Sequence, residues 1–202
     1  MILTDDVIWK HCHLKDLWIF DKLILSQVLG YRCGPVGLQV PEPDFYCIRP
    51  ITNVLGMGRY ARIEWIQDST DHYHPGEFWC EVFEGEHLSV DYYQKQSVLV
   101  VRGEREKNAP LYQWKKWERL EKQVEFPQVL NELYDDYEWI NCEFIGDKLI
   151  EVHFRSNPDF VYNNSVAIPI WDGAENEIKN EENYKYITSS DYHRIGFLID
   201  EK

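Results

Sequence analysis

The amino-acid sequence predicts an α+β fold whose sheet is mainly antiparallel. Residues 14–30 carry apolar positions at helical spacing, and residues 45–106 hold short apolar segments separated by polar turns. Residues 141–157 have the pattern of a β-hairpin, because two apolar runs flank the turn signal Gly146-Asp147. The order helix, mixed strands, helix, hairpin is typical of the α+β class.

The N-terminal third is expected to hold one helix and one strand. The helix covers residues 14–30, with Gly30 as its stop signal. Residues 31–44 are rich in proline and glycine and predict a loop. Residues 45–50, "FYCIRP", predict a strand, and the loop that follows contains two further glycines.

The rest of the chain is expected to be mostly strands around one more helix. Four strands are expected over residues 61–67, 78–85, 86–94 and 97–106. Most of residues 111–137 predicts a helix, with Pro127 near a break or in a first turn. After Trp171 we expect a charged loop or short helix, and then the apolar end "IGFLI".

Composition and charge exclude several classes of protein. The formal net charge is −14 and the pI is near 4.9, so the surface lacks the basic field that duplex nucleic acid requires. The sequence has no run of about 18 apolar residues, so no membrane-spanning helix is expected. The acidic residues near the N-terminus argue against a signal peptide. Five scattered cysteines are typical of reduced thiols. A cytoplasmic location is therefore expected.

One face of the predicted hairpin is unusually polar. Glu151, His153 and Arg155 alternate along its second strand and share one face, and Glu143 lies on the first strand. Two carboxylates on adjacent strands repel each other unless a cation such as Mg²⁺ lies between them. Arg155 offers a fork suited to a phosphate or carboxylate. The competing interpretation is a solvated edge with cross-strand ion pairs.

Two other segments have features of a nucleotide site. Arg49 ends a strand that leads into the loop with Gly56-Met57-Gly58, and such a loop can offer backbone N–H groups to phosphates. The two glycines alone favour a plain turn, and the arginine on the preceding strand supports the phosphate interpretation. In "FWCEVFEGEHLSVDYY", a bend between two strands could hydrogen-bond an adenine edge, with Val82 or Phe83 packing beside it. The alternative is a simple hairpin.

In their order along the chain, these motifs resemble those of the ATP-grasp superfamily. The resemblance covers roughly residues 20–160 and rests on "DK" at a helix start, "YCIRP…GMG", "CEVFEGEHLSVD" and "EFIG…IEVHFR". Two positions depart from the family pattern. Arg49 stands where the family has a lysine, and His153 stands where it has an asparagine.

The resemblance implies two small lobes with mainly antiparallel sheets that enclose a nucleotide cleft. We place the first lobe at residues 1–92 and the second at residues 93–202. The family's usual N-terminal Rossmann-like domain has no counterpart, so either a protein partner supplies it or the acceptor substrate docks directly. The compact, Trp-rich sequence also suggests a phage or viral protein, which would act in the host cytoplasm.

The resemblance also implies a role for each candidate residue, with ATP and Mg²⁺ as cofactors. Glu143, Glu151 and His153 are the expected metal ligands, and the histidine makes Mn²⁺ the alternative ion. Lys22 and Arg49 are expected to meet the phosphates, with Lys22 and Arg155 as the catalytic cations. The remaining nucleotide contacts are the lid Gly56, Met57 and Gly58, the adenine-binding Glu81, Val82 and Phe83, and Glu84 and His87 near the ribose.

The implied activity is ATP- and Mg²⁺-dependent ligation of a carboxylate to an amine or thiol through an acyl phosphate. The expected substrate is a small-molecule or peptide carboxylate, and no membrane partner is expected. Two alternatives stay open. One is a non-catalytic acidic protein that binds a nucleotide or a protein on a degenerate core of this kind, and the other is a kinase on the same fold.

Overall fold

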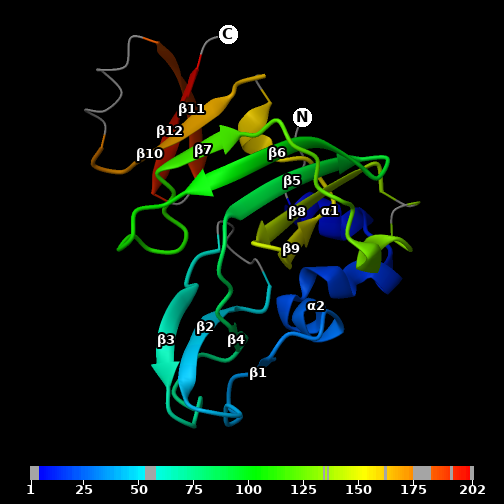
Figure 1. The fold of residues 1–202 in the computed structure, drawn as a ribbon, viewed down its shortest axis with the longest axis vertical. Coiled ribbons are helices and arrows are strands. Elements are labelled where there is room, and N and C mark those ends of the chain that lie inside the picture. The colour runs from blue at the N-terminus through cyan, green and yellow to red at the C-terminus, as the bar shows by residue number, and fades with distance from the viewer. Residues whose placement is uncertain are drawn as a thin grey trace.

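The computed structural model describes residues 5–52, 58–133, 135, 137–161, 163–174, 183–191 and 193–200. These residues form two sheets and a helical N-terminal segment (Figure 1). Every strand pairing in this part of the chain is antiparallel. The predicted α+β class with mainly antiparallel sheets is thereby confirmed.

The smaller sheet has the strand order β1-β4-β2-β3 and lies at the bottom of Figure 1. Its strands are β1 (Cys33–Pro35), β2 (Asp44–Pro50), β3 (Arg62–Ile66) and β4 (Glu77–Glu81). Strand β1 falls inside the predicted loop 31–44, where only three residues pair with β4. Tyr46, Ile48 and Trp79 form the core on one face of this sheet.

The larger sheet has the order β11-β12-β10-β7-β6-β5-β8-β9. Its strands are β5 (His87–Tyr93), β6 (Gln96–Glu104), β7 (Lys116–Arg119), β8 (Trp139–Ile145), β9 (Lys148–His153), β10 (Val166–Trp171), β11 (Tyr184–Asp191) and β12 (Arg194–Asp200). The sheets separate between Glu81 and His87, so β5 belongs to the larger one. The lobe boundary after residue 92 stays a prediction.

Most of the helices cover one face of the larger sheet: α1 (Asp5–His11), the 3₁₀ helix η1 (Leu14–Phe20), α2 (Lys22–Val28) and the short 3₁₀ helix η2 (Gln128–Leu130). The short 3₁₀ helix η4 (Pro158–Phe160) lies on the other face, where Phe160 packs with Val101 and Ala167. Ile19 and Leu25 pack with Val90 and Tyr92 of β5 in the largest core cluster. Because side chains alternate along a strand, His87, Ser89 and Asp91 point to the opposite face of β5.

The predicted helix over residues 14–30 is broken in two. Asp21 has an extended backbone between η1 and α2, and its side chain accepts a hydrogen bond from the backbone N–H of Ile24 at 2.9 Å. An aspartate at this position caps the following helix. The apolar spacing continues across the break, which explains why periodicity alone predicts a single helix.

The predicted helix over residues 111–137 is wrong. The segment contains strand β7, turns and the short η2. Trp117 pairs with Gly103 of β6 and with Ala167 of β10, and Trp114 packs on the same glycine. Strand pairing and aromatic packing therefore override the helical propensity of the charged residues. Strands β10 and β11 are further elements that the sequence patterns did not predict.

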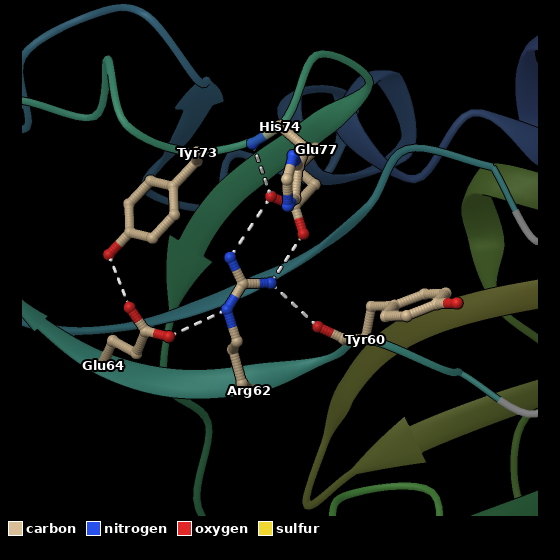
Figure 2. A network of polar contacts seen from close by, with 6 residues as sticks. All are labelled: Tyr60, Arg62, Glu64, Tyr73, His74 and Glu77. Atoms are coloured by element: carbon tan, nitrogen blue, oxygen red, sulfur yellow. Dashed lines mark hydrogen bonds and ion pairs between the residues drawn. The ribbon is translucent and has the colours of Figure 1, made fainter.

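A polar network holds together one face of the smaller sheet (Figure 2). The Arg62 guanidinium lies between two carboxylates, 2.8 Å from Glu64 Oε1 and 2.6 Å from Glu77 Oε1, and it also donates to the carbonyl of Tyr60 at 3.0 Å. Tyr73 donates to Glu64 at 2.8 Å. The network fixes the residues that follow the glycine-rich loop against β3 and β4.

Candidate nucleotide and metal site

The β8–β9 hairpin brings the two candidate acids face to face. Glu143 and Glu151 are directly opposite each other in the strand register. The register then shifts, because Phe144 pairs with Leu149 and leaves Ile150 as an extra residue. This β-bulge turns Leu149 into the core and keeps Glu151 on the polar face.

Lys22 and His153 contact the same carboxylate. Lys22 Nζ lies 3.0 Å from Glu151 Oε2, and His153 Nε2 lies 3.2 Å from Glu151 Oε1. All three side chains are buried. Burial by itself raises the pKa of Glu151, but the ammonium of Lys22 and the hydrogen bond from His153 outweigh it, so the pKa is lowered. Glu151 is therefore ionised at neutral pH.

Arg49 links the smaller sheet to the hairpin. Its Nη2 donates to the carbonyl oxygen of Ile150 at 3.1 Å, and its guanidinium lies 5.1 Å from the Phe78 ring centroid. Ile150 is the bulge residue that has no register partner on β8. Arg49 and Lys22, which come from different elements, thus place two cations at the acidic end of β9.

Glu143 has a different partner. Its Oε2 lies 3.2 Å from His87 Nε2, and the His87 ring packs 4.5 Å from the Trp114 ring centroid. Burial by itself raises the pKa of Glu143. The hydrogen bond with His87 lowers it by more than burial raises it, so the net shift is downward. Glu143 is partly exposed on the same face as Glu151.

The predicted adenine-binding segment connects the two sheets. Glu81 ends β4 and its Oε1 accepts a hydrogen bond from the backbone N–H of Arg32 at 2.8 Å. The Phe83 ring packs edge-on against Tyr31, with centroids 4.8 Å apart. Val82 lies between Glu81 and Phe83 in the chain and is partly buried, whereas Glu84 is exposed. Within the described residues, Val82 to Glu86 pair with no strand, and the carbonyl of Glu86 accepts a hydrogen bond from the backbone N–H of Gly146 at 2.9 Å.

The remaining candidates are more dispersed. Arg155 follows β9 and donates to the carbonyl of Ser156 at 3.2 Å. Gly58 has a positive φ of 61°, which suits a turn. Gly56 and Met57 lie outside the described residues.

A small cavity of about 10 Å³ adjoins the Lys22–Glu151 pair. It is lined by Trp9, Ile19, Phe20, Lys22, Glu151, Val152 and His153. The buried indole N–H of Trp9 has no hydrogen-bond partner among the described residues. A volume of this size holds about one water molecule.

Sequence patterns missed a buried polar network behind the site. Asp91, Asn141 and Ser89 are almost completely buried and hydrogen-bond one another and Asn157. The alternation His87, Ser89, Asp91 along one strand was the available signal, since it continues the polar face of the hairpin. Asn157, in the loop after β9, has no such pattern.

The chemistry of the donors fits a magnesium ion. Mg²⁺ takes one or two protein carboxylates and fills its remaining positions with phosphate oxygens and water, and Glu143 and Glu151 are opposed across one strand pair. Within the described residues, no group of three or more His, Cys, Asp and Glu side chains is arranged to hold a metal.

The part of the chain that the structure describes contains no helix of the length and hydropathy that a membrane crossing requires.

No protein-family model matches the chain, and no curated protein matches it. Solved structures do. An L-amino acid ligase from Bacillus licheniformis aligns over 91% of this chain and 67% of its own, with 9% identity and a TM-score of 0.53. The chain has an ATP-grasp fold. At this identity the likeness establishes the fold, and the chemistry must be argued from the residues.

Two further structures are similar to a lower degree. A putative ATP-grasp superfamily protein from Archaeoglobus fulgidus has 13% identity and a TM-score of 0.48, covering 92% of this chain and 65% of its own. The ATP-grasp ligase PsnB, complexed with a minimal precursor, has 14% identity and a TM-score of 0.44, covering 68% and 52%. The chain thus spans about half to two thirds of the length of the structures it matches.

Proposed function

We propose that the protein is an ATP- and Mg²⁺-dependent ligase that joins a carboxylate to an amine or thiol. The observation that carries this proposal is that two cations reach neighbouring residues of β9: Lys22 contacts the Glu151 carboxylate, and Arg49 of the smaller sheet contacts the carbonyl of Ile150. Two cations beside an acidic hairpin suit a nucleoside triphosphate, because the cations and a metal ion held by the acids together neutralise the phosphate charge.

Each side of the site has a separate task in this proposal. Lys22 and Arg49 bind phosphate oxygens, the linker from Glu81 to Glu84 binds the adenine through its backbone, and His87 lies near the ribose. Glu143 and Glu151 hold Mg²⁺, which neutralises phosphate charge when bound. Each oxygen of Glu151 already contacts another side chain, Oε2 that of Lys22 and Oε1 that of His153, so metal binding requires one of these contacts to break.

Arg155 and Lys22 stabilise the charge that develops on the transferred phosphoryl group. The phosphoryl group passes from ATP to the substrate carboxylate and leaves ADP. The amine or thiol then attacks the acyl carbon and releases inorganic phosphate. A small-molecule or peptide carboxylate is the substrate class that we propose, in keeping with the name of the L-amino acid ligase that shares the fold.

Calorimetry with ATP and Mg²⁺ tests the nucleotide site. We expect saturable binding that Glu151→Gln abolishes, because the variant loses one of two metal-binding charges. Glu104→Gln is the matched control, since this acid is exposed on β6 and pairs with Lys115 instead. Absence of binding at millimolar ATP would contradict the proposal.

Release of ADP over a panel of carboxylate and amine pairs tests the chemistry. A passive nucleotide-binding protein is the second candidate, and it is favoured by the contacts that Glu151 and Glu143 already make with Lys22 and His87. ATP binding without ADP release in any pair would support that candidate. Phosphate transfer to an alcohol would instead support a kinase.

A further inference from the structure

Asp91 is a buried acid, and removing an ionised carboxylate from water is energetically unfavourable. It lies in the middle of β5 and is only 3% exposed. Burial raises its pKa to about 6, although hydrogen bonds from Asn157 and Asn141 act in the opposite direction. A buried carboxylate is retained only where several donors compensate it.

One backbone N–H group donates to both oxygens of the Asp91 carboxylate. The N–H of Asn157 lies 2.9 Å from Asp91 Oδ1 and 3.0 Å from Oδ2, so it is shared between both oxygens. Asn141 Nδ2 donates to Oδ1 at 2.8 Å. The hydroxyl of Ser89 accepts from the same Asn141 amide at 2.9 Å and from the Asn157 side chain at 3.1 Å.

Asn157 in turn organises the segment that follows β9. Its side-chain oxygen accepts from the backbone N–H of Asp159 at 2.9 Å and caps the short helix η4. The carboxylate of Asp159 lies 3.3 Å from Arg194 Nη1 of β12. The segment is therefore attached to β5 at one end and to β12 at the other. Arg155 stands two residues before the β5 attachment.

We propose that Asp91 is a positioning residue for Arg155. Its carboxylate binds the Asn157 backbone, holds residues 155–160 against β5 and so sets where the Arg155 guanidinium can reach. This inference rests on the proposed function, in which Arg155 stabilises the transferred phosphoryl group. Asp91 itself does not contact the reacting atoms.

The first test measures hydrogen exchange of the peptide covering residues 155–161, together with steady-state turnover of ATP. Asp91→Asn keeps the size of the side chain but turns an amide NH₂ toward donors. We expect exchange to accelerate about tenfold and kcat to fall about tenfold, the equivalent of one charge-assisted hydrogen bond, with little change in the KM for ATP. Ser89→Ala is the control, because it leaves the Asn157 backbone contacts intact.

A second pair of variants removes the donor instead of the acceptor. Asn157 has a φ of −63°, so proline fits the backbone there and deletes only the N–H and the side chain. Asn157→Ala deletes the side chain alone. Asn157→Pro should therefore change exchange and kcat at least as much as Asp91→Asn, whereas Asn157→Ala should show the smaller effect.

The outcomes separate the two proposals. Wild-type exchange in Asp91→Asn would overturn the positioning role, and so would faster exchange with an unchanged kcat. If wild-type protein turns over no ATP, the proposed function is contradicted, and the exchange data alone then decide whether Asp91 holds the segment.

Discussion

At the scale of single residues, the Lys22–Glu151 ion pair is the most strongly buried charge contact described. Lys22 is 4% exposed and Glu151 is 8% exposed. The cost of removing both charges from water is offset only while both partners are present, and removing one leaves the other uncompensated. The same pair that prepares the proposed phosphate site therefore also stabilises the packing of α2 on β9.

Lys22→Met should lower the free energy of unfolding by about 3–5 kcal/mol, because it leaves a buried carboxylate without its ammonium partner. Urea denaturation measures the change. Lys115→Met is the control, since Lys115 forms only exposed ion pairs with Glu104 and Glu106. Adding Glu151→Gln to Lys22→Met should recover part of the loss. Equal stabilities of the two single lysine variants would contradict the expectation.

Asp91 should make stability depend on pH in a particular direction. Its folded pKa of about 6 lies above the usual value of 3.8, so the folded state holds the proton more tightly. This contribution is complete below about pH 4 and is lost as the pH rises through 6, to a total of about 3 kcal/mol. The difference in unfolding free energy between wild type and Asp91→Asn should fall accordingly between pH 4 and pH 7. A pH-independent difference would contradict the assignment.

At the scale of elements, the linker between the sheets touches the β8–β9 turn. A Cβ on Gly146 would lie 2.7 Å from the carbonyl oxygen of Glu84, and a Cβ on Gly85 would lie 2.6 Å from the Gly146 Cα. Such distances require the backbone to shift. Two glycines therefore set how closely the predicted adenine-binding linker approaches the acidic hairpin.

Gly146→Ala tests this approach against a matched control. Gly146 and Gly30 both have positive φ, at 61° and 74°, but a Cβ on Gly30 meets nothing within 4 Å. Each alanine costs about 1–2 kcal/mol for the left-handed backbone. Only Gly146→Ala should add a further loss of stability and weaken nucleotide binding. Equal losses in thermal unfolding, with unchanged calorimetry, would show that the close contact has no effect.

Elements differed in how well local patterns predicted them. The hairpin over residues 141–157 follows from a turn signal between apolar runs, and both features are local. The segment over residues 111–137 has the charge and length of a helix, yet Trp114 and Trp117 are placed by Gly103 on another strand. Contacts between distant segments decide such cases, and no local pattern records them.

At the scale of the whole molecule, the two sheets are connected by the linker and by the Arg49 contact to Ile150. A ligand that binds only the folded protein stabilises it by an amount that grows with the logarithm of the ligand concentration above the Kd. ATP with Mg²⁺ at one hundred times its Kd should raise the free energy of unfolding by about 2.7 kcal/mol.

Thermal unfolding with and without ATP measures this effect, and chelation of Mg²⁺ by EDTA should remove most of it. Arg49→Met should reduce the stabilisation more than Arg49→Lys, because lysine keeps a cation for the phosphates but loses the bidentate fork. An ATP-induced shift that is unaffected by either variant would place the nucleotide away from Arg49.

The sequence by itself determined which residue types share a strand face. Glu151 and His153 alternate along a strand, and this alternation predicts a polar face whatever surrounds it, because the side-chain period of a strand is two. It also determined the antiparallel hairpin and the helical character of residues 14–30, but not the strand within residues 111–137.

Only the tertiary structure decided the partner of each charge. Lys22 reaches Glu151 from α2, His87 takes Glu143, and Asp91 binds the backbone of Asn157 across the sheet. These pairs join residues that are far apart in the chain, so they depend on strand order, on the bulge at Ile150 and on packing. A linear pattern of charges shows which groups are available, while burial and distance determine which of them interact.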